Sequence, residues 1–574
     1  MSIAGQPPGP RTRQEPGRFP DRYLLIALGF ILLSCVFVSY HNSFRVPFLL
    51  DGRIFIEHDE KIRRIWPLRD VLHGSSRPLT RLSFALNYCV NKLDVLGYHF
   101  VNLCVHMAAA LALFGLIRRT LRAPRLASRR LPAEWIAFAA ALLWAVHPLQ
   151  TQSVTYIFQR AESFMGLCYV LTVYAAARGF AAGRAAGWLA ASCGFCLLGM
   201  GSKAIMVTAP VMVLVYDRVF WASSWEEIRL KRAFFYLGLA ASWLAVICIA
   251  LGHHESRASA GFALTHIMWL YMLVQPGVIL HYLKISFWPF PLVLDHGWPF
   301  VLDCAGILPL AVILAMVLAT LWALFRRPTL GFLGFWFFFI LMPTSSFFPL
   351  ADPMEEHRMY LPLAAVIVAA VLAVWFIAGR TVRDPRVRSL LLAVALAAAA
   401  VFLITNTVQR NEDYRSRFSM WQDVVSKRPR NPRGHEIIAG IFKERGNFRE
   451  AFVHYREALL HRAFGHLPEA DEACGQYNQG IDLIEQGDTD GAIEHYGYAL
   501  RLKPGFVEAR NNLAVALAAK GRFMEAFVYL MVAGAEQPGS AKIAKNLQDV
   551  QQCLSLRQYD GNTPVPSTKA GDRE

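Results

Sequence analysis

A carboxylate at the edge of an apolar segment is the first residue in this sequence that suggests chemistry. Asp51 lies in the stretch FLLDGRIFIEHDEK (48–61), which follows an apolar run at 22–40. A carboxylate in or near hydrocarbon costs about 2.5–3.5 kcal/mol on membrane-insertion scales, so an acid in this place needs either water or a function. Taking a proton from a reacting hydroxyl is one such function of a carboxylate.

Isolated basic residues, rather than clusters, stand in four later stretches. They are Arg160 in HPLQTQSVTYIFQRAE (147–162), Lys203 in GSK (201–203), Lys284 in YLKISFWPFPLVLDHGW (282–298) and Arg358 in DPMEEHRMYLP (352–362). Single cations at a membrane surface can hold a phosphate group while a carboxylate removes a proton. The pattern indicates transfer of a group from a phosphate-bearing donor, with Arg160, Lys203 and Arg358 as phosphate ligands.

Each of these residues also has a plainer structural interpretation. Asp51 suits a solvated loop or a helix N-cap, and Arg160 is placed to pair with Glu162 across a helix turn. Lys203 can extend to the interface from the end of a span. The doublet Glu355-Glu356 is expected to lie partly on a solvated face, and we take Glu356 as its site member.

A histidine follows this doublet. His357 can cap the next helix, and no second histidine lies nearby at ligand spacing, so we predict no metal site.

Composition shows what must position these residues. The chain has 574 residues, of which 55% are hydrophobic, and its mean hydropathy is +0.33. These values are typical of a multispanning membrane protein with a small soluble part. The net charge of +16 comes from short clusters between apolar runs, which fits membrane topology better than a nucleic-acid groove.

Twelve apolar segments are candidates for membrane spans. They fall at 22–40, 98–117, 134–148, 162–177, 186–200, 204–217, 233–251, 264–288, 304–325, 330–343, 357–378 and 388–405. Loops rich in Lys and Arg at 118–130, 218–232, 326–327 and 379–388 share the cytoplasmic side only if 264–288 does not fully cross. Pro276-Gly277 and the Pro289/Pro291 pair allow a broken, re-entrant or surface-lying element there. We predict eleven spans, the N-terminus inside and the C-terminus outside.

The character of the chain changes at about residue 406. The phrases GNFREAFVHY (446–455), GDTDGAIEHY (487–496) and GRFMEAFVYL (521–530) recur, with Gly487 and Gly521 34 residues apart. This period predicts tetratricopeptide repeats, in which Gly ends the first helix of each pair and Ala lies where the helices touch. HLPEADE (466–472) is an expected inserted loop.

The fold class predicted is therefore all-α: a polytopic membrane helix bundle followed by a soluble tetratricopeptide solenoid. The predicted divisions are a cytoplasmic tail (1–21), a transmembrane domain (22–405), an extracytoplasmic repeat domain (406–554) and a disordered tail (555–574).

Several motifs in order resemble one family. PFLLD, RPLTRLSFALNY (77–88), GYHFVNLCVH (97–106), HPLQTQSVTYIFQRAE, GSKAIMVTAPVMVLVYD (201–217), PLADPMEEHRMYLP (349–362) and the repeats are similar to the transmembrane and tetratricopeptide repeat-containing O-mannosyltransferase family. The resemblance implies a C-type glycosyltransferase fold that takes a sugar from a polyprenyl-phosphate donor outside the cytoplasm. It also implies that an acid of the first external loop is the base, a position that Asp51 matches.

The family commonly has a second acid directly after this base, where the present sequence has Gly52. The role of that acid is then lost, or moved to Glu57, Asp59 or Glu60.

The hypothesis is an inverting displacement in which Asp51 deprotonates an acceptor hydroxyl and the lipid phosphate leaves. The residues predicted to support the site or the acceptor are Glu57, Arg77, Gln159, Glu162, Glu356, His357 and Tyr360. We expect no cofactor besides the donor, no nucleic acid, a protein acceptor bound through the repeats, and contact with membrane lipid. Ala/Arg-rich spans favour a bacterial inner membrane with periplasmic repeats.

Two other classes remain open. A non-catalytic membrane scaffold would explain Gly52, and its repeats would recruit partner proteins. A lipid-linked sugar transporter would need charged residues along a path through the bilayer, whereas here they gather at one end.

Overall fold

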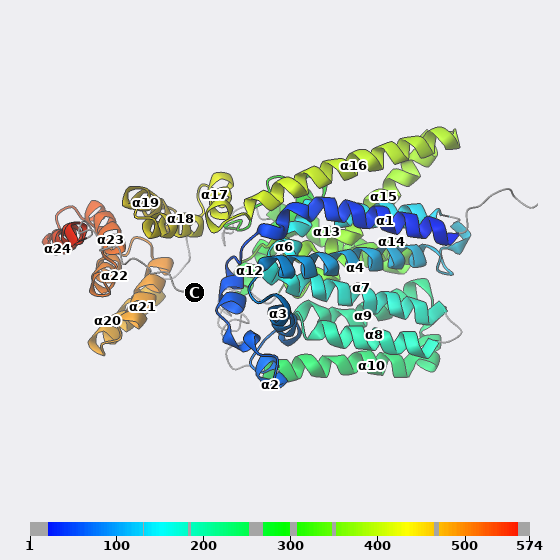
Figure 1. Cartoon of the computed structure of the whole chain (residues 1–574), viewed down its shortest axis with the longest axis horizontal. Coiled ribbons are helices and arrows are strands. Elements are labelled where there is room, and N and C mark those ends of the chain that lie inside the picture. Colours follow the sequence, from blue (N-terminus) through cyan, green and yellow to red (C-terminus); the bar gives the residue numbers. More distant parts are fainter. Residues whose placement is uncertain are drawn as a thin grey trace, which may run out of the picture.

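The computed structural model describes residues 21–129, 131–181, 185–251, 268–298, 307–346, 350, 352–463 and 470–560. All regular elements in this part of the chain are helical. Figure 1 shows long, nearly parallel helices in one bundle, with the C-terminal helices beyond one end of it. The predicted all-α class is confirmed.

Each predicted apolar segment corresponds to a helix. The bundle consists of α1 (Asp21–Tyr40), α4 (Val95–Leu121), α5 (Ala133–Ala145), α7 (Arg160–Ala181), α8 (Ala185–Met200), α9 (Ala209–Phe220), α10 (Trp225–Leu251), α13 (Ile307–Arg326), α14 (Pro328–Leu341), α15 (Pro362–Thr381) and α16 (Pro385–Asp413). In the described part of the chain seven of these (α1, α4, α7, α10, α13, α15 and α16) are long and apolar enough to cross a membrane, and α5, α8 and α14 are shorter apolar helices. The chain is thus a multi-pass membrane protein, and eleven crossings stay a prediction.

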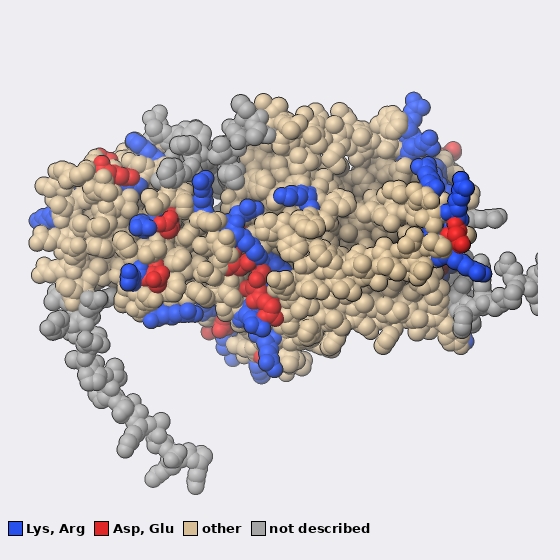
Figure 2. Space-filling view, turned by 90° about the horizontal axis from the view of Figure 1, so that it is seen from above, with Lys and Arg blue, Asp and Glu red and all other residues tan. Residues whose placement is uncertain are grey.

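The loops rich in arginine meet at one end of the bundle. Arg118 and Arg122 both pair with Glu134, and Arg232 pairs with Asp217. Figure 2 shows Lys and Arg gathered at the end of the bundle away from the C-terminal helices. The predicted grouping of these basic loops is observed.

Helix α12 (Met268–Phe287) corresponds to the segment that was not expected to cross. The hydroxyl of Tyr271, near its start, donates to the carbonyl of Thr344 at 2.7 Å. The hydroxyl of Tyr282, near its end, donates to the carbonyl of Glu355 at 2.9 Å. Both partners lie in the connection between α14 and α15, so α12 stays at the end of the bundle where that connection lies.

Of the forms that the sequence allowed for this segment, the broken one is not observed, because Pro276 lies inside the continuous helix α12.

Short helices form the cap of the bundle at this end. They are η1 (His41–Arg45), the π-helical turn η2 (Arg53–Glu57), η3 (Glu60–Arg63), α2 (Leu68–Leu72), α3 (Pro78–Asn91), η5 (Pro148–Gln150), α6 (Thr151–Val154), η6 (Ile157–Gln159), η7 (Ala204–Thr208) and η10 (Glu356–Met359). These short helices and the loops between them carry many of the polar residues considered below.

The C-terminal helices follow the predicted repeat pattern. They are α17 (Arg417–Lys427), α18 (Pro432–Glu444), α19 (Phe448–Ala463), α20 (Ala470–Glu485), α21 (Thr489–Leu502), α22 (Val507–Ala519), α23 (Phe523–Glu536) and α24 (Ala541–Asp560). Gly446, Gly487 and Gly521 have φ of 74°, 83° and 70°, so each ends the first helix of a pair in a left-handed conformation. The alanines of the three phrases, Ala451, Ala492 and Ala526, are fully buried, as predicted.

The described boundaries differ from the predicted ones in two places. The boundary at 405/406 falls inside α16, which ends at Asp413. The prediction of disorder from residue 555 is wrong for residues 555–560, because α24 continues to Asp560. Residues 466–469 of the predicted inserted loop lie outside the described residues.

The first C-terminal helices pack on the membrane bundle. Trp421 and Ile438 share a buried cluster with Leu49, Tyr156 and Leu294. Arg410 of α16 pairs with Asp423 of α17 at 2.9 Å, which joins the two parts by charge. Apolar burial and an ion pair therefore fix α17 and α18 against the capping loops.

Candidate functional site

Asp51 lies on the wall of a polar cavity. Its backbone N–H donates to the hydroxyl of Tyr156 at 3.0 Å, and its carboxylate is half-buried. Burial raises the pKa of Asp51, Arg77 opposes this rise, and Glu355 adds to it. The preceding residue, Leu50, has φ of 43°, a left-handed conformation that non-glycine residues seldom adopt away from functional sites.

The cavity has an empty volume of about 530 Å³. It is lined by Leu50, Asp51, Gln152, Tyr156, Gln159, Leu294, Asp295, Asp352, Met354, Glu355, Trp421 and Arg433. Most of these come from the loops that cap the bundle, but Trp421 and Arg433 come from α17 and α18. The cavity is therefore built jointly by the membrane bundle and the first C-terminal helices.

Glu355 supplies a second carboxylate to this cavity. Burial alone would raise the pKa of Glu355, but the positive charges of Arg358 and Lys203 hold it below its usual value. Arg358 pairs with it at 3.1 Å and His357 lies 3.4 Å away. Glu355 is thus an ionised acid whose charge reaches Asp51.

Two cations, Arg77 and Lys203, are carried by neighbouring loops. The loops that carry Arg77 and Lys203 are joined by a hydrogen bond from the N–H of Leu79 to the carbonyl of Gly201 at 2.9 Å. Gly201 permits this approach because a Cβ there would lie 2.7 Å from Leu79. Burial lowers the pKa of Lys203, and the positive charge of Arg77 lowers it further.

These two cations differ in their partners. Lys203 forms an ion pair with Glu162. Arg77 lies over the ring of Phe158 at 5.4 Å, and its buried Nη1 has no hydrogen-bond partner among the described residues. Neither Arg77 nor Lys203 is among the residues that line the cavity, but the charge of Arg77 acts on Asp51 of its wall. An unsatisfied charged donor that close to Asp51 is a place where an anion would be stabilised.

Arg160, predicted as a phosphate ligand, is occupied by the protein itself. Its Nε donates to Asn102 at 2.5 Å, its Nη1 to Asn87 at 2.6 Å, and its Nη2 to the carbonyl of Tyr98 at 2.9 Å. The side chain is fully buried. Arg160 therefore joins α3, α4 and α7. The alternative pair of Arg160 with Glu162 is not formed either, because Glu162 pairs with Lys203.

Arg358, the third predicted ligand, is also satisfied within the protein. Its guanidinium donates to the carbonyls of Asp352 at 2.6 Å and Pro353 at 2.8 Å, and to Glu355. It is buried and is not among the residues that line the cavity. It holds the connection between α14 and α15 and fixes Glu355.

The predicted member of the acidic doublet was the wrong one for the cavity. Glu356 is buried rather than partly solvated. It accepts from the N–H of Val293 at 2.5 Å, contacts His296 at 3.1 Å, and lies 3.6 Å from Arg410. Glu356 therefore fixes the segment after α12 to α16, while Glu355 faces the cavity.

The remaining predicted residues divide between cavity and core. Gln159 lines the cavity. His357 is buried, and its backbone N–H donates to the side-chain oxygen of Gln152 at 2.8 Å. Burial together with the charge of Lys203 holds the pKa of His357 well below its usual value. It is therefore neutral.

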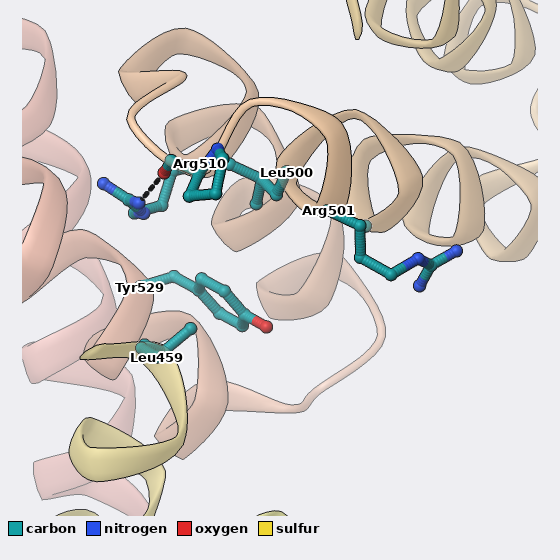
Figure 3. A pocket seen from close by; sticks show the side chains of 7 residues that line it. Leu459, Leu500, Arg501, Arg510 and Tyr529 are labelled. Atoms are coloured by element: carbon teal, nitrogen blue, oxygen red, sulfur yellow. Dashed lines mark hydrogen bonds between the residues drawn. The ribbon is translucent and has the colours of Figure 1, made fainter. Parts of the chain in front are cut away.

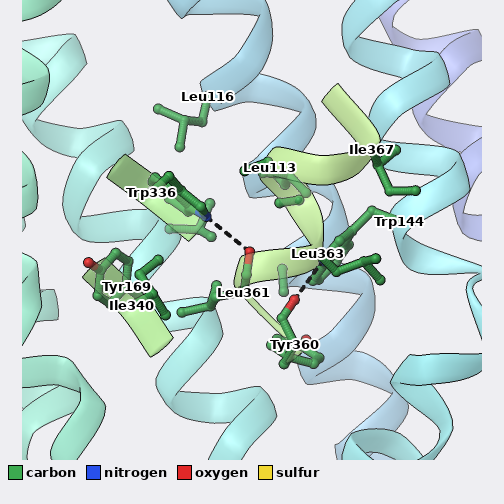
Figure 4. Close-up of a cluster of buried hydrophobic side chains, with 14 of the residues drawn as sticks. Leu113, Leu116, Trp144, Tyr169, Trp336, Ile340, Tyr360, Leu361, Leu363 and Ile367 are labelled. Atoms are coloured by element: carbon green, nitrogen blue, oxygen red, sulfur yellow. Dashed lines mark hydrogen bonds between the residues drawn. The ribbon is translucent and has the colours of Figure 1, made fainter. Parts of the chain in front are cut away.

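Tyr360 and Glu57 lie away from the cavity. Figure 4 shows Tyr360 among buried apolar side chains, where its carbonyl accepts from Trp144 at 2.7 Å. Its hydroxyl bonds to His106 at 2.9 Å. Glu57 pairs with Arg53 at 3.5 Å.

The acids considered as replacements for the missing second carboxylate do not reach the cavity. Glu57 and Asp59 pair with Arg53 and Arg81, and neither lines it, nor does Glu60. Tyr156, Asp295, Asp352, Trp421 and Arg433 are among the lining residues that the sequence did not single out. Three of the quoted stretches contain Tyr156, Asp295 and Asp352, whereas Trp421 and Arg433 reach the cavity only because α17 and α18 pack on the bundle.

In the described part of the chain, three or more His, Cys, Asp or Glu side chains do not come together in a metal-binding arrangement.

The fold and the cavity define a class: a multi-pass helical membrane protein with a polar cavity where the bundle meets a C-terminal helical-repeat domain. A tetratricopeptide repeat family model matches residues 483–548. The chain is 25% identical over 612 residues to Protein O-mannosyl-transferase Tmtc3 of Drosophila melanogaster, covering 88% of this chain and 63% of that protein. It is 25% identical to Protein O-mannosyl-transferase TMTC1 of Homo sapiens, covering 74% of this chain and 54% of that protein.

The resemblance to the transmembrane and tetratricopeptide repeat-containing O-mannosyltransferases is confirmed by these relatives. The chain spans less than two thirds of the length of both. A solved structure, ArnT from Cupriavidus metallidurans bound to undecaprenyl phosphate, is 16% identical with a TM-score of 0.39, over 77% of this chain and 75% of that one. At that TM-score the likeness defines neither fold nor ligand for this chain.

Proposed function

We propose that the chain is a membrane glycosyltransferase that moves a sugar, mannose, from a polyprenyl-phosphate donor to a hydroxyl of a protein acceptor. One observation carries the proposal. Asp51, a half-buried carboxylate on a cavity wall, lies within the electrostatic reach of Arg77, whose buried Nη1 has no partner among the described residues. A base and an unsatisfied cation side by side suit attack by a hydroxyl and departure of a phosphate.

The proposed step is a single displacement with inversion. The carboxylate of Asp51 takes the proton of the acceptor hydroxyl, whose oxygen forms a bond to the anomeric carbon. The bond from that carbon to the phosphate oxygen breaks, and the electron pair leaves with the lipid phosphate. The raised pKa of Asp51 makes it a stronger base than an exposed aspartate.

Of the three phosphate ligands predicted from the sequence, Lys203 is kept and Arg77 is added, while Arg160 and Arg358 are no longer proposed. A phosphate leaving group needs charge stabilisation more than protonation, and two cations in a water-poor place supply it. Glu355 is proposed to take the place of the acid that Gly52 lacks, because its charge reaches both Asp51 and Lys203. No cofactor beyond the lipid-linked sugar enters the proposal.

The proposed location is a bacterial inner membrane with the cavity and the repeats on the periplasmic side. The arginine-rich loops at the opposite end of the bundle support this orientation. The protein acceptor is proposed to bind through the repeats. Figure 3 shows one concave place in them, where Leu459, Leu500, Arg501, Arg510 and Tyr529 surround a pocket.

A transfer assay tests the proposal. Purified full-length protein is supplied with radiolabelled polyprenyl-phosphate sugars and a panel of peptides that carry serine or threonine. We expect label in peptide with wild type and its loss with Asp51→Asn. Absence of transfer to peptide and to water from every donor would contradict the proposal.

A non-catalytic scaffold is the second candidate, and Gly52 favours it. Gly52 has φ of −62°, and a Cβ there would meet Phe48 at an ordinary 3.8 Å. The fold therefore does not demand glycine at this position, and its presence has no steric explanation. Partner recruitment that is unchanged in an Asp51→Asn variant, together with the absence of transfer by the wild-type protein, would support the scaffold.

A further inference from the structure

The solvent-exposed part of the cavity wall, here called its mouth, contains Arg433 and Asp352, whose side chains are 52% and 43% exposed. Arg433 of α18 lies 3.3 Å from Asp352 and 3.5 Å from Asp295. Its guanidinium also lies over the ring of Trp421 at 5.7 Å. The helix before it is held by Lys427, which donates to the carbonyl of Leu292 at 3.0 Å. These contacts place a tryptophan, an arginine and two aspartates at one rim.

Two residues that line this cavity each carry a buried polar atom without a partner among the described residues. The two atoms are Nε1 of Trp421, on a side chain 1% exposed, and Oε1 of Gln159, on a side chain 7% exposed. Leaving such a group unsatisfied costs about 1–3 kcal/mol. One is a donor and the other an acceptor, which is the complement of a peptide unit with its C=O and N–H.

The charges at the mouth do not balance. Asp295 and Asp352 share the single guanidinium of Arg433. Deeper in the cavity, Glu355 has its own partner in Arg358. The side chain of Asp352 is 43% exposed, so a cation arriving from outside can reach it. One carboxylate therefore lacks a full counter-charge at the place where an acceptor would enter.

We propose that Trp421, Gln159, Asp295, Asp352 and Arg433 form a peptide subsite that prefers a Lys or Arg side chain close to the acceptor hydroxyl. The main chain of the peptide binds Trp421 and Gln159, its basic side chain pairs with Asp352, and its hydroxyl points to Asp51. This assignment rests on the proposed function and names the acceptor class for the same site.

The experiment uses the full-length protein and three peptides that differ only beside the acceptor serine, with Lys, Gln or Glu. Exposed ion pairs contribute about 0.2–1 kcal/mol, so kcat/KM should fall by about two- to fivefold from Lys to Gln and again to Glu. Asp352→Asn should remove this order. Asp490→Asn is the matched control, because Asp490 is exposed, makes the same kind of ion pair and lies on α21. It should keep the order.

A second variant separates peptide from sugar. Trp421→Phe keeps the ring and removes the N–H, so it should raise KM for all three peptides and leave KM for the donor unchanged. A raised donor KM would show that the sugar occupies this part of the cavity and would overturn the proposal. So would an unchanged peptide order in Asp352→Asn.

Binding without turnover distinguishes this proposal from the proposed function. Fluorescent forms of the same peptides, titrated against the protein without donor, should bind in the order Lys, Gln, Glu, and Asp352→Asn should abolish the order. If wild type transfers no sugar yet binds peptides in this order, the peptide subsite stands and the glycosyltransferase proposal falls. If binding shows no order, the subsite falls whatever the activity.

Discussion

The backbone N–H of Asp51 and the hydroxyl of Tyr156 are joined by a hydrogen bond of 3.0 Å across 105 residues of sequence. Tyr156 is buried in the cluster that also contains Trp421. This bond fixes the loop after α1 to the rigid connection between α5 and α7. The carboxylate of Asp51 is thereby held at the cavity wall by a group that leaves its oxygens available.

The first prediction separates the chemistry of Asp51 from its placement. Asp51→Asn should lower turnover by about 10²–10⁴-fold with little change in donor binding, because an amide cannot accept the proton. Tyr156→Phe keeps the carboxylate but leaves the N–H of Asp51 unpaired, so a smaller loss of about tenfold is expected. Steady-state transfer rates and donor titrations measure both. Near wild-type turnover in Asp51→Asn would place the base elsewhere.

The second prediction concerns pH. The base works when ionised, so activity should rise with pH through the pKa of Asp51. Arg77 lowers that pKa and Glu355 raises it. Arg77→Gln should therefore move the acidic limb of the pH–rate profile to higher pH, and Glu355→Gln should move it to lower pH.

The sign of these shifts is the test. Profiles of kcat/KM for the two variants should bracket that of wild type. Shifts in the same direction would show that Asp51 is not the group that titrates.

The third prediction separates a ligand cation from a structural one. Arg77→Gln should weaken donor binding and slow turnover together, because the phosphate is present in both the ground and the transition state. Its melting temperature should change little. Arg160→Gln should instead lower the melting temperature sharply, since Asn87, Asn102 and the carbonyl of Tyr98 lose their buried donors. Each buried acceptor left unsatisfied costs about 1–3 kcal/mol.

Thermal unfolding in detergent and donor binding by titration provide the two measurements. A stable Arg160→Gln protein that has lost only donor affinity would restore Arg160 as a phosphate ligand.

Hydropathy and repeat period were sufficient to predict the helices and the repeats. Apolar runs match the bundle helices, and the glycines that recur in the repeat phrases end helices with positive φ. Sequence also placed Asp51, Gln159 and Lys203 at one end of the bundle. These signals are local, since each depends on residues within one or two helices.

The role of each cation could not be predicted from its local sequence. Arg160 and Arg77 are both single basic residues in polar stretches, yet only Arg160 meets two asparagines and a carbonyl from other helices. Glu355 and Glu356 are neighbours, but they lie at the start of a 3₁₀ turn, where successive side chains point about 120° apart. Which of them faces the cavity depends on α12 and α16, and that is set by tertiary packing.

The fourth prediction tests the orientation of the bundle. Single cysteines at 125 and 384 should be protected from an impermeant thiol reagent added outside, and cysteines at 295 and 450 should react. The reason is that arginine-rich loops stay in the cytoplasm, and that Asp295 pairs with Arg433 of the C-terminal helices. Labelling of 384 from outside would require α12 to cross and would separate the residues of the cavity.

The last prediction concerns how much of the C-terminal part the cavity needs. Deleting 447–574 removes the helices after α18 but keeps Trp421 and Arg433. This protein should still release sugar from the lipid donor to water, while its transfer to protein acceptors should fall.

Deleting 414–574 also removes Trp421, Arg433 and the cover that α17 gives to Tyr156 and Leu294. It should lose both activities, because the cavity then opens to water and fixed charges stabilise a leaving group less well in water. Donor hydrolysis and protein transfer, measured on both truncations beside wild type, give the comparison. Equal loss of both activities in the shorter deletion would assign the repeats a structural role, and equal retention in the longer one would show that the membrane bundle forms the site alone.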